Sequence, residues 1–453
     1  MITLRQFLQS LVLNVNRLPY GLKLTRLPYR LALHAVIRLV GRYPTVKAVY
    51  ARNSYALGTW VPGRSDIDLT LILDARSSPD EEMRTVQGFR KGYAALVRRF
   101  PMLGEFEVIN EAHLDAWTRY SITGYEARFW LPLYGSHPVR TLHHGEAEQL
   151  KLDRLNHALS IYMHQMSPVL WSAPRPVLKR YVIKIMGYLD SPVEVGTDGA
   201  LGTMSRNGIQ TLVLHELGAR VSCEYPAEGG HTLDLDRILG RKLIPEVENG
   251  PSERLNSLLE TSAGTISAVL TSRFSQGNVY CLLADDLDPG RMTEGIVAAC
   301  EAGLDASKIM PLKLFTHYLH YLDPLEYLGL VQQRTLLAGT DPLAEPNPYP
   351  ADRFDRAIRE ASVYILNFPY NPSLEEVRES EFDGLLLGWV ARLARYFEDG
   401  IIDFEYESLL NYWKIKTPPV GIAEWQAKPD ETLARFKLVR MMADAVCAGL
   451  EAN

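Results

Sequence analysis

Residues 53–74 contain the feature that most restricts the fold of this chain, because two aspartates lead directly into a run of apolar residues. The stretch reads NSYALGTWVPGRSDIDLTLILD. The run from Ile67 to Leu73 is typical of a buried strand. Residues two apart on a strand point to the same face, so Asp66 and Asp68 are expected to project together. Two such carboxylates suit Mg²⁺, which takes one or two protein carboxylates and leaves its other positions to water and phosphate oxygens.

A second acidic segment, GEFEVIN from Gly104, predicts another strand. Glu105 and Glu107 share a face there, and Glu107 lies between two apolar residues where partial burial is expected. A carboxylate in that position can bind a metal ion or take a proton from an acceptor hydroxyl, and the sequence leaves both roles open. A purely structural alternative also stays open, in which the acids cap strand ends or pair with the nearby cations Arg64, Arg90 and Lys91.

Apolar spacing predicts the elements around these acids in the order helix, strand, strand, helix, strand. The expected ranges are 32–39, 46–51, 67–73, 80–99 and 104–109. From about residue 150 the pattern is mostly helical. Helices are expected at 155–166, 177–188, 209–217, 252–272 and 292–302, with a strand at 278–284.

The chain is expected to be an α+β protein, with a small mixed-sheet domain followed by mostly helical regions. At 453 residues it is too long for a single ordinary core. The expected segments are 1–40 (basic and helical), 41–145 (catalytic), 146–250 (helical), 251–345 (a degenerate second copy of the catalytic domain) and 346–453 (helical).

The expected second copy depends on short sequence echoes that recur in the same order. LTLILDA from Leu69 resembles YCLLADD from Tyr280, and LPLYGSHP from Leu131 resembles TLLAGTDP from Thr335. LDRLNHALSIY from Leu152 resembles DRFDRAIREASVY from Asp352. The second copy has no equivalent of SDID, so a duplicated second half would have lost the acids.

Charge and cysteine content narrow the class of protein. The net charge is −6, which argues against a protein devoted to nucleic-acid backbones. The four cysteines lie far apart without a CxxC pair, so neither a disulfide framework nor a thiolate zinc site is expected, and a reducing cytoplasm fits best. No apolar stretch approaches the roughly 20 residues of a membrane-spanning helix. GxGxxG and P-loop motifs are also absent from the sequence.

The N-terminal segment is strongly basic, since ten Lys and Arg residues precede Asp66, the first acidic residue. With leucines spaced for one helical face, this segment can contact a membrane surface or another anionic partner. The alternative is an amphipathic helix packed on the catalytic domain, which is the more common role of such helices.

NSYALG, followed by SDIDL and a later acidic strand, resembles the signature of the DNA polymerase β-type nucleotidyltransferases. The turn is similar to the G-S-Y-A-R-G of small stand-alone members, and the glutamate of the later strand is similar to that of aminoglycoside adenylyltransferases. The resemblance covers residues 40–140. It implies metal binding and catalysis by Asp66, Asp68 and Glu107. It implies nucleotide binding by a second set of residues, namely Asn53, Ser54, Gly58, Arg64 and Ser65.

Two positions depart from the family pattern. Asn53 stands where the family has glycine, and Leu57 stands where small members often have arginine. Asparagine tolerates the left-handed backbone conformation better than other non-glycine residues, so the turn is expected to survive the first change. The second change removes a contact that could select the nucleotide.

The resemblance implies transfer of a nucleoside monophosphate, with ATP as the expected donor, to a hydroxyl of a small molecule or protein. A pair of Mg²⁺ ions would draw charge from the α-phosphate and from the leaving pyrophosphate. One alternative is a nucleotidyltransferase-like nucleotide sensor or scaffold, which the changes at Asn53 and Leu57 favour. Another is transfer to an RNA 3′ end, which the overall acidity disfavours.

Overall fold

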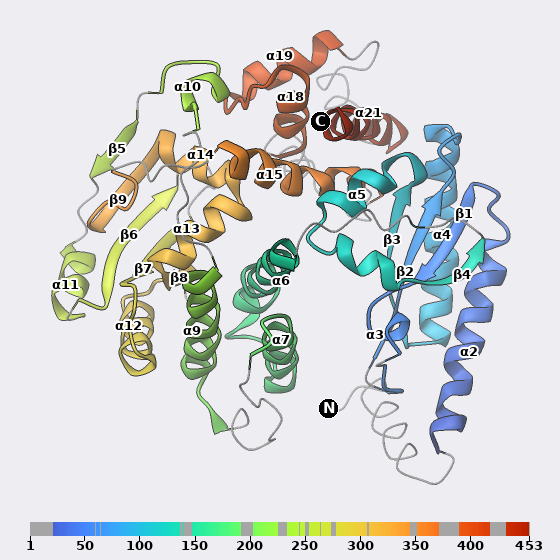
Figure 1. Ribbon diagram of the computed structural model, residues 1–453, viewed down its shortest axis with the longest axis horizontal. Helices are drawn as coiled ribbons and strands as arrows, with labels where there is room; N and C mark the ends of the chain where they lie inside the picture. Colours follow the sequence, from blue (N-terminus) through green and yellow to red (C-terminus); the bar gives the residue numbers. More distant parts are fainter. Residues whose placement is uncertain are drawn as a thin grey trace. The chain divides into compact units, whose positions relative to one another are not determined.

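The computed structural model contains two compact units. The described residues are 21–58, 60–63, 65–135, 139, 147–191, 203–224, 233–243, 245–249, 253–262, 264–272, 278–305, 308–344, 351–370, 389–416 and 432–452. One unit comprises Met1–His144 and Ser362–Asn453, and the other comprises Gly145–Ala361. Each has helices and a sheet of parallel and antiparallel strands, which confirms the α+β class (Figure 1). The five segments expected from the sequence are thus grouped into two units.

The first unit is built on a four-stranded sheet with the order β3-β2-β1-β4. The strands are β1 (Val46–Ala51), β2 (Ile67–Leu73), β3 (Leu103–Asn110) and β4 (Leu131–Gly135). β1 is antiparallel to β2 and β4, whereas β2 and β3 are parallel. The structure confirms the predicted bounds of β1 and β2. It adds β4, which the sequence did not indicate because none of its residues is buried.

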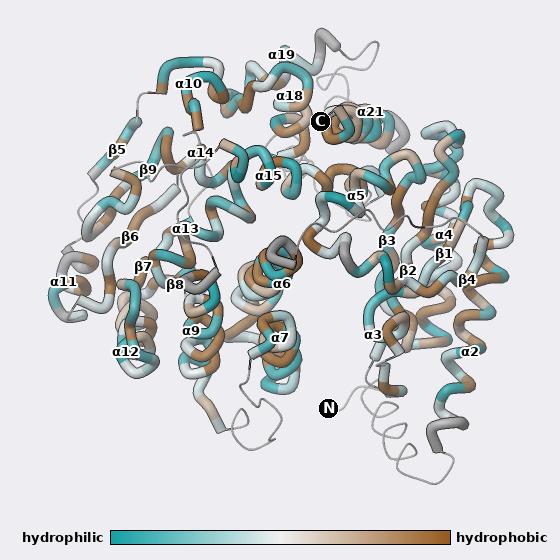
Figure 2. The backbone as a smooth tube through the Cα atoms, in the orientation of Figure 1, coloured by the Kyte–Doolittle hydropathy of each residue, from teal (hydrophilic) through white to brown (hydrophobic). Residues whose placement is uncertain are grey.

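Helices α2 (Gly21–Val40) and α4 (Pro79–Arg99) contribute to a common core with the sheet. Apolar and polar residues alternate along α2 in Figure 2, as expected for a helix with one buried side. Ile67, Leu69 and Leu71 of β2 belong to this core. Because side chains alternate along a strand, Asp68 and Thr70 face the opposite side of the sheet.

Aromatic side chains and a C-terminal segment contribute to the rest of this unit. Trp130 lies 5.4 Å from Trp117 and 5.9 Å from Tyr50 between ring centroids. Trp117 lies in α5 (Leu114–Tyr120), and Trp130 directly follows η2 (Gly124–Phe129). Two further short helices, η6 (Val363–Leu366) and η7 (Phe368–Tyr370), come from later in the chain. η6 packs on α5 and η7 on β3, so residues 363–370 from the second half of the chain lie beside elements of its first half.

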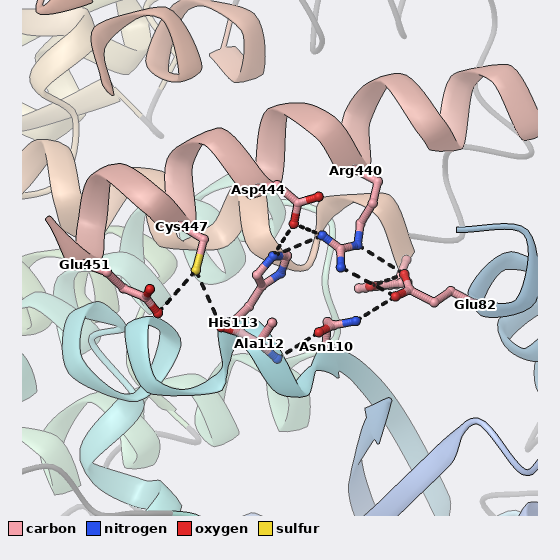
Figure 3. Close-up of polar contacts among 9 residues, drawn as sticks. Glu82, Asn110, Ala112, His113, Arg440, Asp444, Cys447 and Glu451 are labelled. Carbon is pink, nitrogen blue, oxygen red and sulfur yellow. Dashed lines mark hydrogen bonds and ion pairs between the residues drawn. The ribbon is translucent and has the colours of Figure 1, made fainter. Parts of the chain in front are cut away.

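Helix α21 (Thr432–Glu451) packs on α4 through a buried ionic network (Figure 3). The Glu82 side chain is fully buried, and Arg440 donates to its Oε2 over 3.1 Å. The Tyr370 hydroxyl donates to the same oxygen over 2.7 Å, and Asn110 donates to Oε1 over 2.6 Å. Burial raises the pKa of Tyr370, and the charge of Glu82 raises it further. Glu82 therefore joins three elements that are distant in sequence.

The same network includes His113, whose Nε2 lies 2.9 Å from Asp444 Oδ1 and 3.1 Å from Arg440 Nη1. Burial lowers the pKa of His113 to about 3, and the charge of Arg440 acts in the same direction. The imidazole is therefore neutral at pH 7. The other helices of this unit that the structure describes in the C-terminal segment are α18 (Ala391–Asp399) and α19 (Tyr406–Lys416).

The second unit contains a five-stranded sheet with the order β5-β9-β6-β7-β8. Its strands are β5 (Glu246–Asn249), β6 (Ile266–Ser272), β7 (Val279–Leu283), β8 (Ile309–Pro311) and β9 (Gln333–Gly339). Its main described helices are α6 (Ala147–Ile161), α7 (Arg175–Tyr188), α9 (Arg206–Glu224), α11 (Glu253–Thr261), α12 (Pro289–Glu301), α13 (Leu312–Tyr321), α14 (Pro324–Gln332) and α15 (Ala351–Ser362).

Apart from β5, this sheet repeats the first one strand for strand. β6 is antiparallel to β7 and β9, and β7 is parallel to β8. The register of β1 with β2 shifts just after Val46, and that of β6 with β7 shifts just after Ile266. Gly135 and Gly339 pair with equivalent alanines of β1 and β6, and both have positive φ, 73° and 86°. Shared topology and shared irregularities support the duplication.

The structure corrects two details of the sequence prediction. The expected helix at 252–272 ends at Thr261, and its second part is strand β6, ISAVLTS. This segment is almost entirely buried and contains β-branched residues, so its apolar spacing fits a central strand as well as a helix. The echo LTLILDA/YCLLADD is also displaced by one residue, because Leu73 corresponds to Leu283 in the two registers. None of the described helices is long and apolar enough to cross a membrane.

Candidate active site

The turn after β1 places Asn53 beside Asp68. The short helix α3 (Asn53–Ala56) begins there, and Asn53 has φ of 53°, in the left-handed region that asparagine tolerates. Its Nδ2 donates to Asp68 Oδ2 over 2.7 Å. Asn53, which stands where the resemblance predicts a glycine, therefore makes the turn and also orients one of the two aspartates.

The other residues expected to bind nucleotide occupy different positions around this turn. Ser54 is partly exposed in α3, and Gly58 lies exposed just beyond it with φ of 71°. Ser65 closes the next turn, since its Oγ accepts from the Val61 amide over 3.0 Å. Its carbonyl accepts from the Tyr29 hydroxyl over 3.1 Å. Arg64 lies outside the described residues, so its expected nucleotide contact remains a prediction.

Helix α2 packs beside the loop between α3 and β2, which leads to the two aspartates. Trp60 lies 4.7 Å from Tyr29 and 5.0 Å from Tyr55 between ring centroids. The guanidinium of Arg26 lies 5.5 Å from the Trp60 ring centroid. Burial raises the pKa of Tyr55, whereas the positive charges of Arg30 and Arg26 lower it. The basic residues of α2 therefore contribute positive charge next to α3.

Asp66 and Asp68 lie together over Gly104, at the start of β3. A Cβ atom at position 104 would collide with Asp68 Oδ1 and lie 3.1 Å from the Cβ of Asp66. The Tyr93 hydroxyl donates to the Gly104 carbonyl over 3.0 Å. Burial raises the pKa of Tyr93, and the charges of Asp68 and Asp66 raise it further. Glycine at 104 thus leaves room for two adjacent carboxylates.

Glu107 is held on both of its oxygens. Arg52 Nη1 donates to Oε2 over 2.6 Å, and Asn367 Nδ2 donates to Oε1. The Glu107 side chain is 20% exposed and the Arg52 side chain is 14% exposed. Burial raises the pKa of Glu107, and the charge of Arg52 opposes that rise. The Arg52 guanidinium also lies 3.5 Å from Glu105, which confirms that the two glutamates share a face.

The donor set fits Mg²⁺ held by the two aspartates. Asp66 and Asp68 alone supply the one or two carboxylates that Mg²⁺ takes, and phosphate oxygens of a substrate would complete its shell. Both carboxylate oxygens of Glu107 are hydrogen-bonded to other side chains. In this structure Glu107 is therefore not placed as a third metal ligand beside Asp66 and Asp68. Within the described ranges, no group of three His, Cys, Asp or Glu side chains is arranged to hold a metal ion.

The second sheet carries different residues at the equivalent positions. Its register makes Asn278 the counterpart of Asp68 and Tyr280 the counterpart of Thr70. Lys308 is the counterpart of Glu107. The residue after Glu107 pairs with Leu71 of β2, and the residue after Lys308 pairs with Cys281, the equivalent residue of β7. Tyr280 is buried and donates to Glu326 over 3.0 Å, while Lys308 lies 5.5 Å from its ring centroid. An amide and a lysine thus stand where the first unit has Asp68 and Glu107, and a tyrosine stands where it has Thr70.

Two residues of the first site, Arg52 and Asn367, were missed by sequence reasoning. Arg52 could have been found, because it directly follows β1 and precedes the motif turn. Asn367 lies 260 residues from Glu107 in the chain, and no local pattern marks it.

Comparison of the chain with protein-family models, curated proteins and solved structures found no match.

Replacing Gly104 by alanine is expected to weaken Mg²⁺-dependent ATP binding about 10-fold to 100-fold, because the new methyl group displaces Asp68 Oδ1. Isothermal titration calorimetry of the folded variant measures this effect. Gly187→Ala is the matched control, because a Cβ there meets no atom within 4 Å. Equal ATP affinity of Gly104→Ala and Gly187→Ala would contradict the placement of the metal at Asp68.

Proposed function

We propose that this chain is a cytoplasmic, Mg²⁺-dependent nucleotidyltransferase that moves a nucleoside monophosphate from an NTP, with ATP as the donor, to a hydroxyl of a small molecule or protein. The observation that carries the proposal is the pair Asp66 and Asp68, adjacent over Gly104, with Asp68 bonded to Asn53 of the turn. A side chain at position 104 would collide with Asp68, so this glycine allows the two carboxylates to lie close together.

The proposed reaction is an in-line displacement at the α-phosphorus. The acceptor oxygen forms a bond to that phosphorus, the bond to the pyrophosphate oxygen breaks, and pyrophosphate leaves with the electron pair. The proton of the acceptor hydroxyl passes to the Glu107 carboxylate, whose raised pKa suits a general base. Magnesium held by Asp66 and Asp68 would neutralise charge on the α-phosphate and on the leaving group.

The basic residues of α2 support a polyanionic substrate at this turn. Arg26 and Arg30 are exposed and act on Tyr55 in α3, and α2 contains no acidic residue. A triphosphate tail beside α3 would meet these two cations. Contact of the basic N-terminal segment with a membrane or another anionic partner remains a prediction, since residues 1–20 lie outside the described ranges.

The double variant Arg26→Gln/Arg30→Gln is expected to raise the KM for ATP about tenfold or more, because a charge-assisted contact to phosphate is worth about 1.5–3 kcal/mol. AMP affinity should change little, since AMP lacks the β- and γ-phosphates. Arg38→Gln, also exposed on α2 but two turns further from Arg30, is the control. The same loss for AMP as for ATP would argue against a triphosphate contact.

A nucleotide sensor is the second candidate, and one observation favours it. Asn53 is bonded to Asp68, and Arg52 is bonded to Glu107, so both carboxylates are engaged by the protein itself. A sensor would bind Mg²⁺–ATP through Asp68 without turning it over.

Calorimetry combined with a pyrophosphate assay separates the two candidates. For an enzyme, we expect Mg²⁺-dependent ATP binding and pyrophosphate release over a panel of hydroxyl acceptors, both lost in Asp66→Ala. Binding without release over the whole panel would support the sensor. If the original protein neither binds ATP nor releases pyrophosphate, and so behaves like Asp66→Ala, both candidate functions would be contradicted.

A further inference from the structure

The helical segments of the two halves are exchanged between the two sheets. The unit with the first sheet includes Ser362–Asn453, and the unit with the second sheet includes α6, α7 and α9 from the first half. α21 packs on α4 in one unit, and α9 packs on α12 in the other. α4 and α12 are equivalent, because they follow the equivalent strands β2 and β7 and each starts at a proline, Pro79 or Pro289. Each sheet is thus completed by helices from the other half of the chain.

The exchange brings one segment of the second half to the candidate active site. η7 packs on β3, the strand that carries Glu107. Arg90 Nη2 donates to the Tyr370 carbonyl over 3.0 Å, and the Tyr370 hydroxyl donates to Glu82. The Tyr370 amide donates to the Asn367 carbonyl over 3.0 Å. The backbone of Asn367 is therefore held by contacts with α4.

Asn367 and Arg52 hold Glu107 from two parts of the chain, with one carboxylate oxygen each. A carboxylate gripped at both oxygens has a fixed plane, and each oxygen retains a second lone pair that can accept a proton. Thr70, paired directly with Glu107 in the sheet, has a fully buried hydroxyl oxygen without a hydrogen-bond partner in the structure. The polar neighbour that the strand pairing places directly beside Glu107 is therefore buried and does not bond to it, so hydrogen bonds from Arg52 and Asn367 orient its carboxylate.

We propose that Asn367 is a positioning residue of the nucleotidyltransferase site, which orients Glu107 to take the proton of the acceptor hydroxyl. This inference rests on the proposed function. It also means that the second half of the chain, which lacks the acidic pair on its own sheet, completes the site of the first half. Asn367 acts through Glu107 and has no role of its own toward ATP.

A double-mutant cycle between positions 367 and 107 tests the proposal, with pyrophosphate release and Mg²⁺–ATP affinity measured for each protein. Asn367→Ala is expected to lower kcat about 10-fold to 100-fold, with the affinity for Mg²⁺–ATP within twofold of the original. In the Glu107→Gln background, Asn367→Ala is expected to lower kcat no further. Tyr280→Phe is the structural control, since Tyr280 makes a buried side-chain bond to the carboxylate of Glu326 in the second unit. It should lower the Tm and leave kcat near the original value.

The outcomes distinguish this inference from the proposed function. Suppose that the original protein releases pyrophosphate and that Asn367→Ala lowers kcat by the same factor in the original protein and in the Glu107→Gln background. This result would overturn the positioning role and leave the proposed function intact. An equal fall of kcat in Tyr280→Phe and Asn367→Ala, in step with their Tm values, would also overturn the positioning role. No pyrophosphate release by the original protein over the acceptor panel would overturn the proposed function and this inference with it.

Discussion

Replacing Asp68 by asparagine is expected to lower the rate of pyrophosphate release by about 10³-fold or more. The amide removes a charge that binds Mg²⁺, and charge stabilisation by a catalytic metal is worth several kcal/mol, with each 1.36 kcal/mol a factor of ten. Steady-state pyrophosphate release with ATP and Mg²⁺ measures the effect. Circular dichroism of the same sample reports whether the fold is retained.

Asp74→Asn is the matched control for this variant. Asp74 directly follows the other end of β2 and accepts a bond from the Arg76 amide over 2.9 Å. Its charge lies away from the aspartate pair, so its release rate should stay within about threefold of the original, less than 1 kcal/mol. Equal rates in Asp68→Asn and Asp74→Asn would exclude a catalytic metal at Asp68.

Arg440→Met is expected to lower the free energy of unfolding by about 3–5 kcal/mol, because it leaves the fully buried Glu82 without its cation. Urea unfolding followed by tryptophan fluorescence measures the change. The effect should be partly reversed in the double variant Glu82→Gln/Arg440→Met, since the unpaired charge is then removed.

Lys437→Met on the same helix is the control. Lys437 pairs with Asp80 over 3.1 Å, but the two side chains are 49% and 38% exposed. Exposed ion pairs contribute about 0–1 kcal/mol, so this variant should unfold at nearly the original urea concentration. A loss of stability in Lys437→Met as large as in Arg440→Met would show that burial of Glu82 does not control the docking of α21.

The sequence predicted strands β1 and β2 of the first sheet with their observed bounds, because these strands have clear local signals. β1 and β2 are short apolar runs, and Ser78 and Glu81 form a capping box that marks the start of α4. The sequence predicts helix for strand β6, because an almost entirely buried segment lacks the alternation that identifies a strand. β4 has no buried residue and therefore no apolar signal.

The candidate site could be predicted only where its residues are close in sequence. The shared face of Asp66 and Asp68 and the left-handed turn at Asn53 follow from the period of a strand and from the backbone preference of asparagine. The grip of Asn367 on Glu107 depends on which helical segment packs on which sheet. Tertiary contacts such as the ion pair of Glu82 with Arg440 determine this packing. The spacing of apolar residues along the sequence does not predict such contacts.

Parallel incubations with ATP labelled at the α-phosphate or at the γ-phosphate test the central claim most directly. The protein is incubated with Mg²⁺ and a panel of small-molecule and protein hydroxyl acceptors, beside an Asp66→Ala control. The account predicts α-label on an acceptor, all γ-label recovered in pyrophosphate, and no transfer by Asp66→Ala. Transfer of γ-label to an acceptor, or α-label transfer equal in the original protein and Asp66→Ala, would contradict it.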